Sequence, residues 1–280
     1  MKQNNLIGWH MIWWITMFGT AIIFLWFIYN FTNIIMYKKR RTSLYGKVVI
    51  ITGASSGLGE ALAHVFYSCG CKLILISRRN QELLRVKDTL LNTHHTVSTH
   101  IPVVFPLDLT EINTLTSEVA KVSKIYGRID ILINNAAVLP YMIKQKFGHI
   151  VCTSSVQGKI AIPFRSAYTA SKHALQAWCD SARAELSTKN IKITVISAGY
   201  IYTALSLNAL TGTGDKYGIM DKTTKNGYSA KYVADKILES ILRGDKEVTI
   251  ATFTQKIAIS LRVLLPSIYF WLIKPHAKTL

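Results

Sequence analysis

The feature that most constrains the fold is a buried strand, a glycine-rich turn and an amphipathic helix in direct succession, in "KVVIITGASSGLGEALAHVFYSCGCKLILISRRN". Residues 48–51 are a continuous β-branched run, which indicates a strand covered on both faces. The turn leads into a helix with apolar positions on one side, and residues 73–76 form a second apolar strand. This strand–helix–strand unit predicts a parallel sheet with helices on both of its faces.

The alternation of strands and helices continues along the chain. We expect helices near residues 81–91 and 111–126, and strands at 103–105, 131–133 and 149–153. The pattern predicts an α/β fold, a Rossmann-like doubly wound parallel sheet, over residues 46–252. With 280 residues, the chain is long enough for one such domain and an attachment device.

The attachment device is an apolar run at residues 6–37 that contains no Asp, Glu, Lys or Arg. A helix of roughly 20 apolar residues is enough to cross a bilayer. A cleaved signal peptide would have a shorter apolar core and small residues at its cleavage site, whereas here bulky residues run into "KKRR". We therefore predict an uncleaved, single-pass signal anchor, residues 1–41, with the main domain facing the cytosol. The endoplasmic reticulum is the default membrane for such an anchor, and the peroxisome stays open.

The charge of the chain favours a membrane over a nucleic acid as its partner. The net charge is +18, from 33 Lys and Arg against 15 Asp and Glu, and it is scattered rather than concentrated on a basic face with aromatic platforms. Residues 257–273 are apolar but are interrupted by Arg262 and Pro266. We expect residues 253–280 to form a membrane-interfacial segment rather than a second span.

The cysteines predict neither a disulfide nor a metal site. The chain has four, Cys69, Cys71, Cys152 and Cys179, and no CxxC pair. We expect reduced structural thiols, as is usual in the cytosol.

The glycine-rich turn lies where the diphosphate of a dinucleotide would sit. Small residues let the backbone approach the phosphates, and the amides of a helix N-terminus favour negative charge. A plain tight turn is the alternative, but the position inside a strand–helix–strand unit favours the cofactor. The candidate contacts in the turn are Gly53, Ser55, Ser56, Gly57, Leu58 and Gly59.

The end of the second strand indicates which dinucleotide binds. An acidic residue there would hold a free ribose 2′-hydroxyl, whereas this chain has Arg78 and Arg79, which suit a 2′-phosphate. We therefore favour NADP(H) over NAD(H), with solvated arginines as the alternative. Asp108, after the third strand, could accept a hydrogen bond from the adenine amino group or cap the next helix.

A candidate proton-transfer group opens a helix further along, in "YTASK". Tyr168 and Lys172 are four residues apart and share one face of that helix. A nearby ammonium lowers the pKa of a phenol, which makes tyrosine a usable acid and base near neutral pH. Upstream, Ser155 ends a strand, where its hydroxyl could bind a substrate carbonyl and stabilise the developing negative charge.

Residues 46–251 resemble the short-chain dehydrogenase/reductase family, through the motifs TGASSGLG and NNAA, the strand-end serine and YTASK. The apolar N-terminus resembles that of the membrane-anchored members of this family. The resemblance implies hydride transfer between NADP(H) and an alcohol/carbonyl pair. It implies Tyr168 as the general acid/base, Lys172 as its modulator and a ribose contact, and Ser155 as the group that polarises the carbonyl. Asn135 and Thr203 would line the nicotinamide side.

One departure from the family concerns the link after NNAA. The family has a longer connection there, with a long helix that carries a fourth catalytic residue, an asparagine, and commonly forms part of a homodimer interface. Here residues 136–148 are the whole link, and no asparagine occurs between Asn135 and Ser155. A parallel crossover needs at least about 10–12 residues, so the sheet can close over a short, taut helix near residues 139–147. We expect activity and stability to fail first at this shortened crossover.

The sequence therefore predicts a membrane-anchored, NADP(H)-dependent oxidoreductase of a hydrophobic, lipid-like substrate, with residues 204–228 as a flap on the substrate side. The resemblance suggests acyl- or alkyl-dihydroxyacetone phosphate, a steroid or a retinoid as substrate. The alternative is a shortened, non-catalytic isoform that binds nucleotide or membrane only, and a third possibility is a chain that does not fold.

Overall fold

The computed structural model describes residues 2–93, 100–134, 138–205, 207–209 and 214–274. It divides into two compact units, Met1–Ser43 and Leu44–Leu280.

The first unit is the helix α1 (Lys2–Thr42), and its Thr16–Thr42 segment is long and apolar enough to cross a membrane. Polar side chains in this segment bond to the helix's own backbone: the hydroxyl of Thr20 donates to Met17 O and the amide of Asn30 donates to Trp26 O. Polar groups satisfied in this way are less costly to place in hydrocarbon.

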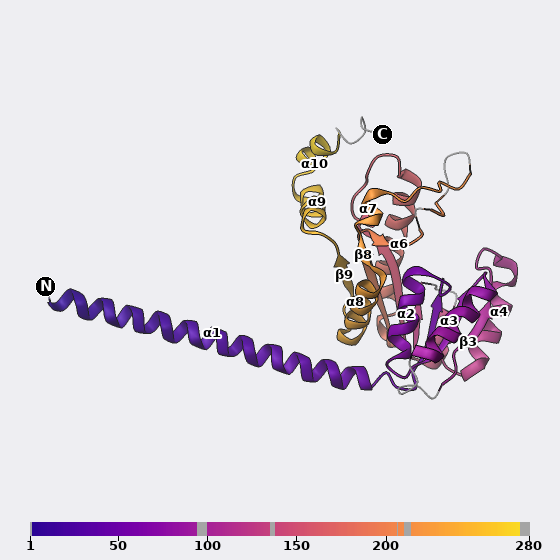
Figure 1. Cartoon of the computed structure of the whole chain (residues 1–280), viewed down its shortest axis with the longest axis horizontal. Coiled ribbons are helices and arrows are strands. Elements are labelled where there is room, and N and C mark those ends of the chain that lie inside the picture. The colour runs from indigo at the N-terminus through magenta and orange to yellow at the C-terminus, as the bar shows by residue number, and fades with distance from the viewer. Residues whose placement is uncertain (1, 94–99, 135–137, 206, 210–213, 275–280) are drawn as a thin grey trace. The chain divides into compact units, whose positions relative to one another are not determined.

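The second unit is built on a seven-stranded parallel sheet with the order β3-β2-β1-β4-β5-β6-β9 (Figure 1). This confirms the doubly wound parallel sheet expected from the sequence, and the predicted strands lie within one or two residues of the observed ones. The strands are β1 (Val48–Thr52), β2 (Lys72–Ser77), β3 (Val103–Pro106), β4 (Ile131–Ile133), β5 (Gly148–Ser155), β6 (Ile191–Ala198) and β9 (Glu247–Ile250).

Helices cover both faces of the sheet, because successive residues of each buried strand point to opposite sides. Val49 and Ile51 pack on the side of α2 and α8, whereas Val48 and Ile50 pack on the side of α4 and α6. The helices on the first side are α2 (Gly57–Tyr67), α3 (Asn80–Thr93) and α8 (Ala230–Arg243); those on the second are α4 (Ile112–Tyr126), α5 (Leu139–Gln145) and α6 (Ser166–Glu185).

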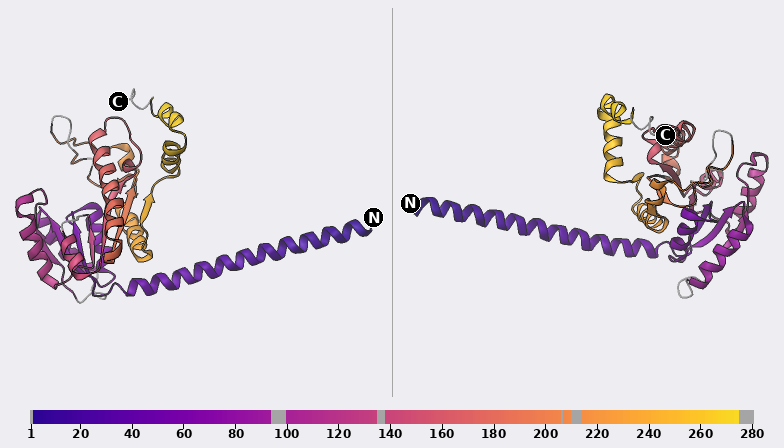
Figure 2. Two further views of the ribbon diagram at one scale, coloured as in Figure 1. Left: turned by 180° about the vertical axis from the view of Figure 1, so that it is seen from behind. Right: turned by 45° about the horizontal axis from the view of Figure 1, so that its top comes forward.

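Most of the remaining elements gather at the carboxyl end of the sheet. They are the 3-10 turn η1 (Val156–Gly158), the strand pair β7 (Ile201–Tyr202) and β8 (Tyr228–Ser229), α7 (Lys222–Lys225), α9 (Phe253–Leu264) and α10 (Pro266–Ile273). The 3-10 turn η2 (Ser187–Lys189) lies at the amino end of β6. In both views of Figure 2, α9 and α10 lie together beyond the end of β9.

The short crossover closes over the sheet through the seven-residue helix α5. Met142 is fully buried, and a Cβ added at Gly148 would lie 2.5 Å from its sulfur, so the helix packs directly on the start of β5. The side chain of Gln145 accepts a hydrogen bond from Ile129 N (3.2 Å) and donates one to Phe147 O (2.8 Å). These contacts fasten the C-terminal part of the crossover to the start of β5 and to Ile129, just before β4.

Candidate active site

The turn between β1 and α2 has the backbone of a phosphate-binding loop. Gly53 and Gly57 have φ of 68° and 60°, in the left-handed region that favours glycine. A side chain at Gly59 would collide with the carbonyl oxygen of Gly53, so the helix starts in contact with the turn. Ser56, the N-cap residue, makes no side-chain cap bond, which keeps the amides at the helix N-terminus available to an anion. The turn therefore fits a dinucleotide diphosphate.

Arg79 lies over this turn. Its guanidinium donates to the hydroxyl of Ser55 (2.9 Å) and to that of Ser56 (2.8 Å). Arg85 of α3 makes a bidentate pair with Glu60 of α2 (2.8 and 2.9 Å), which ties α3 to the helix that follows the turn. The predicted cofactor residues Ser55, Ser56 and Arg79 are thus in direct contact.

Asp108 does not cap the next helix, so that alternative was wrong: the N-cap residue of α4 is Glu111. The Asp108 carboxylate instead closes a local turn, accepting from the backbone N–H (3.0 Å) and the hydroxyl (2.8 Å) of Thr110. These hydrogen bonds hold the pKa of Asp108 below its usual range, with a smaller contribution from Arg78, whose nitrogen is 3.9 Å away.

Asn134 is a structural residue of the site that the sequence analysis missed. It has a left-handed backbone (φ 73°), its N–H donates to Val151 O, and its side-chain oxygen accepts from Thr153 N, each at 2.8 Å. It thereby joins the ends of β4 and β5, beside Ser155. The signal in the sequence was the pair of asparagines directly after a strand, since asparagine tolerates this conformation. Asn135 lies outside the described residues.

Ser155 and the start of α6 are linked through Gln157. The hydroxyl oxygen of Ser155 accepts from Gln157 N (3.1 Å), and the buried Gln157 side chain accepts from the hydroxyl of Thr169 (3.2 Å). Thr169 directly follows Tyr168. This buried connection, which the sequence pattern did not predict, fixes the strand-end serine relative to the helix that carries the tyrosine.

Tyr168 and Lys172 face each other across one turn of α6. Lys172 Nζ lies 5.6 Å from the centroid of the Tyr168 ring and donates to Thr153 O at 3.2 Å. Burial lowers the pKa of Lys172, because an ammonium is poorly solvated there. Tyr168 stays partly exposed, at 38%, so the residue is accessible from outside the protein.

Thr203 lies against the glycine-rich turn: a Cβ added at Gly57 would be 3.2 Å from the methyl group of Thr203. The segment after it is closed at its base by the pairing of β7 with β8. Arg165, just before α6, donates to Asp221 (2.9 Å), which also accepts from the hydroxyl of Tyr217 (3.2 Å). These bonds connect residues 217–221 to the start of the helix that carries Tyr168.

All four cysteines are buried free thiols. Within the described part of the chain, no group of three or more His, Cys, Asp or Glu is placed to hold a metal ion.

A glycine-rich turn, a strand-end hydroxyl and a tyrosine–lysine pair at the carboxyl end of a parallel sheet are typical of nicotinamide-dependent oxidoreductases. The family described as short chain dehydrogenase matches residues 47–138 and 136–212, and the chain belongs to that family.

Named relatives of the chain support its place in this family. The chain is 49% identical to the dehydrogenase/reductase SDR family protein 7-like of Anopheles gambiae, with 88% of each chain covered. It is 37% identical to the dehydrogenase/reductase SDR family member 7B of Mus musculus, covering 90% of this chain and 87% of that protein. A short chain dehydrogenase/reductase from Burkholderia phymatum in complex with NAD has the same fold, with a TM-score of 0.67, 20% identity, and 78% of this chain and 93% of that chain covered.

The comparisons also bear on the short crossover. The two matched segments of the family overlap at residues 136–138, at the end of NNAA. The alignment with the mouse protein runs over 283 positions, more than the 280 residues of this chain, although it covers only 90% of them. The relative therefore carries residues inside the matched region that this chain lacks.

Proposed function

We propose that this chain is a membrane-anchored, NADP(H)-dependent reductase that acts on the alcohol/carbonyl group of a hydrophobic, lipid-like substrate. The observation that carries the proposal is the placement of Tyr168 and Lys172 on one face of α6, joined to Ser155 through Gln157 and Thr169.

The residues of the chain have separate parts in this reaction. Ser155 accepts its backbone hydrogen bond from Gln157 N, which leaves its own hydroxyl proton for a substrate carbonyl oxygen. Tyr168 donates a proton to that oxygen during reduction and takes it back during oxidation. The Lys172 ammonium, held by Thr153 O, stabilises the tyrosinate form and would contact the nicotinamide ribose of a bound cofactor. Bound NADP(H) supplies or accepts the hydride.

Arg79 supports the preference for NADP(H). Arg79 follows the end of β2, near where a ribose 2′-phosphate would bind, and its guanidinium donates to Ser55 and Ser56 of the turn after β1. A guanidinium binds phosphate through several donors in a fixed plane, which suits this role. Arg78, whose side chain is 73% exposed and lies near Asp108, makes a smaller contribution.

The anchor supports a location in the endoplasmic reticulum membrane with the second unit in the cytosol, and the peroxisomal membrane is the alternative. Lys39, Arg40 and Arg41 in the last turn of α1 are the basic flank that stays on the cytosolic side.

The test is binding followed by turnover. The full chain, purified in detergent, is titrated with NADPH and NADH by nicotinamide fluorescence and then assayed with a steroid ketone, a retinal and an alkyl-dihydroxyacetone phosphate. We expect tighter binding of NADPH and oxidation of NADPH with at least one hydrophobic carbonyl. NADPH binding without turnover of any of these substrates would refute the enzyme assignment.

A second candidate function is a non-catalytic nucleotide-binding protein. The observation that favours it is the shortened crossover, because α5 has only seven residues and the region provides no asparagine for the fourth catalytic position. Inserting a family-length helical segment after Ala137 separates the two candidates. If the insertion produces turnover in a chain that had none, the shortened crossover is the reason why the chain lacked activity. The same insertion tests whether that helix is needed for a homodimer.

A further inference from the structure

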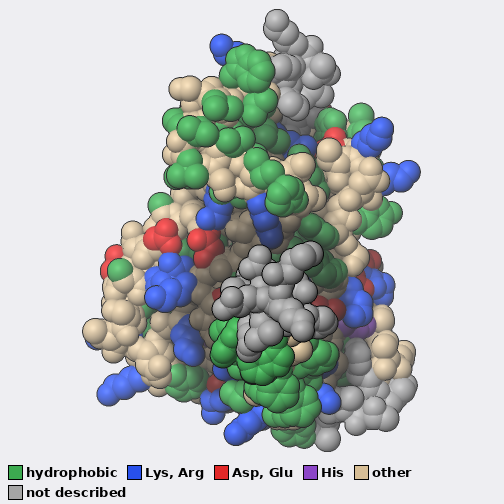
Figure 3. Space-filling model, turned by 90° about the vertical axis from the view of Figure 1, so that its left-hand side faces the viewer, with side chains coloured by type: hydrophobic (Ala, Val, Ile, Leu, Met, Phe, Trp, Pro, Cys, Tyr) green, Lys and Arg blue, Asp and Glu red, His purple; other side chains and the backbone are tan. Residues whose placement is uncertain are grey.

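The last two helices expose an unusual amount of apolar surface. No residue of α9 is buried, and α10 buries only Tyr269. Phe253, Val263, Leu264 and Trp271 are 77%, 73%, 73% and 68% exposed. In Figure 3 hydrophobic side chains gather at the top of the molecule, where Figure 1 shows α9 and α10.

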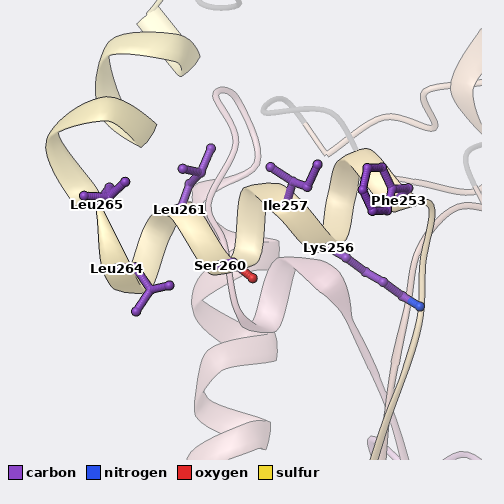
Figure 4. Close-up of a pocket in the computed structure, with 7 residues that line it drawn as sticks. All are labelled: Phe253, Lys256, Ile257, Ser260, Leu261, Leu264 and Leu265. Atoms are coloured by element: carbon purple, nitrogen blue, oxygen red, sulfur yellow. The ribbon is translucent and has the colours of Figure 1, made fainter. Parts of the chain in front are cut away.

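A groove of about 300 Å³ runs along α9. Its lining is almost wholly apolar: Phe253, Ile257, Leu261, Leu264 and Leu265, with Lys256 and Ser260. Figure 4 shows Ile257 and Leu261 projecting from one side of α9, and Lys256 and Ser260 from the other. Contiguous apolar surface of this kind marks a site of interaction with a partner or a membrane.

The charges around this surface indicate which of these it meets. Glu247 is the last acidic residue of the sequence, so α9 and α10 contain none, whereas they carry Arg262 and Lys256. The Arg262 guanidinium lies 5.0 Å from the centroid of the Phe270 ring, which places its charge between the two helices and beside apolar side chains. Apolar residues with basic residues among them are typical of a segment that enters the surface of an anionic bilayer.

We propose that α9 and α10 form a second membrane contact, which inserts its apolar side chains into the surface of an anionic bilayer. The position of this contact gives it a role in substrate delivery. The hydroxyl of Tyr269 donates to Ala161 O at 2.5 Å, and Ala161 lies in the loop between Ser155 and Tyr168. This hydrogen bond thus joins the proposed membrane-contacting surface to the loop between Ser155 and Tyr168. This role in delivery rests on the proposed function; the membrane contact itself does not.

The contact is tested with single labels on the full chain. The four native cysteines are buried, so an added surface cysteine is the one that reacts. Leu264→Cys and Trp271→Cys are labelled with an environment-sensitive fluorophore and reconstituted into vesicles of phosphatidylcholine with phosphatidylserine that contain nitroxide lipids. Ile112→Cys, on an apolar residue of α4 that is 78% exposed, is the matched control.

We expect fluorescence at positions 264 and 271 to fall at least about two-fold, with little change at 112, since a label within the acyl region meets the quencher directly. Weaker quenching in vesicles of phosphatidylcholine alone would support a contribution of the basic residues to membrane binding. Equal quenching in both kinds of vesicle would refute that contribution. Quenching at 264 and 271 no greater than at 112 would overturn the membrane contact.

Delivery is tested with a double variant, Leu264→Glu with Leu265→Glu. For a ketone dissolved in the bilayer we expect KM to rise roughly ten-fold, because the leucines no longer hold the loop at the membrane surface. For a water-soluble ketone KM stays the same. An equal change for both ketones would overturn the delivery role. A wild-type chain that turns over no ketone would refute the proposed function and leave the quenching result standing.

Discussion

The ammonium of Lys172 lies 5.6 Å from the ring centroid of Tyr168, one helical turn away on α6, and donates to the carbonyl of Thr153. The lysine is held by the strand that ends in Ser155, so the charge beside the tyrosine is fixed by the sheet and not by the helix alone. Burial lowers the pKa of this lysine, which makes its charge sensitive to alkaline pH.

Replacing Tyr168 tests the proton-transfer role. We expect Tyr168→Phe to lower kcat by roughly 10²–10⁴-fold, the usual contribution of a positioned acid, while the affinity for NADPH changes little. Steady-state kinetics and NADPH fluorescence measure the two effects. Tyr232→Phe is the control, since Tyr232 has a similar exposure of 44% and lies on α8. Unchanged kcat in Tyr168→Phe would remove this residue from the mechanism.

Replacing Arg79 tests the cofactor preference. We expect Arg79→Ala to weaken NADPH binding roughly ten- to hundred-fold, because hydrogen bonds to a charged group contribute about 1.5–3 kcal/mol. Binding of NADH, which has no 2′-phosphate, should change far less. Arg78→Ala is the matched comparison, with a smaller loss expected because Arg78 makes only a 3.9 Å ion pair. Equal losses for NADPH and NADH in Arg79→Ala would mean that the arginine only supports the turn.

The positions of β1 to β5 could be predicted from the sequence because each of these strands contains a short apolar run between two predicted helices or turns. Ser155 could be placed at the carboxyl end of the sheet because it ends a predicted parallel strand. Gln157 could not be found in this way, since its role depends on Thr169, twelve residues away, and no local pattern signals that contact. The tie between Tyr269 and Ala161 spans 108 residues and is likewise a tertiary feature.

His149 makes the stability of the second unit depend on pH. It is buried on β5, and its Nε2 lies 2.8 Å from the hydroxyl of Thr194, which itself donates to Asp245 O. Burial, with a smaller effect from Lys192, lowers the pKa of His149 from 6.5 to about 4. The folded state therefore binds this proton less readily than the unfolded state. The resulting stability is present above pH 6.5 and is lost as the pH falls toward 4.

Between pH 7.5 and pH 5 we expect this group to remove about 2 kcal/mol from the free energy of unfolding. His149→Gln keeps a donor near Thr194 and has no such titration. Equilibrium denaturation in detergent at the two pH values gives the difference between wild type and variant. Parallel losses in both proteins would show that His149 titrates normally in the folded state.

The shortened crossover can be tested without altering its length. Met142 is fully buried against Gly148, whereas its neighbour Ile143 is 37% exposed. We expect Met142→Ala to lower the free energy of unfolding by about 2–5 kcal/mol, and Ile143→Ala by less than about 1 kcal/mol. Equal effects would mean that α5 does not pack as the structure has it.

A double-mutant cycle then asks whether Met142 and Gly148 act as one contact. A Cβ at Gly148 would lie 2.5 Å from the Met142 sulfur and 2.8 Å from its Cγ, so Gly148→Ala forces the methionine to move. In Met142→Ala with Gly148→Ala both of these atoms are gone. The double variant should therefore be less destabilised than the sum of the single changes, with a coupling of roughly 0.5–3 kcal/mol. Strict additivity would mean that the crossover adjusts freely, and a crossover that adjusts freely is not the point at which this fold fails first.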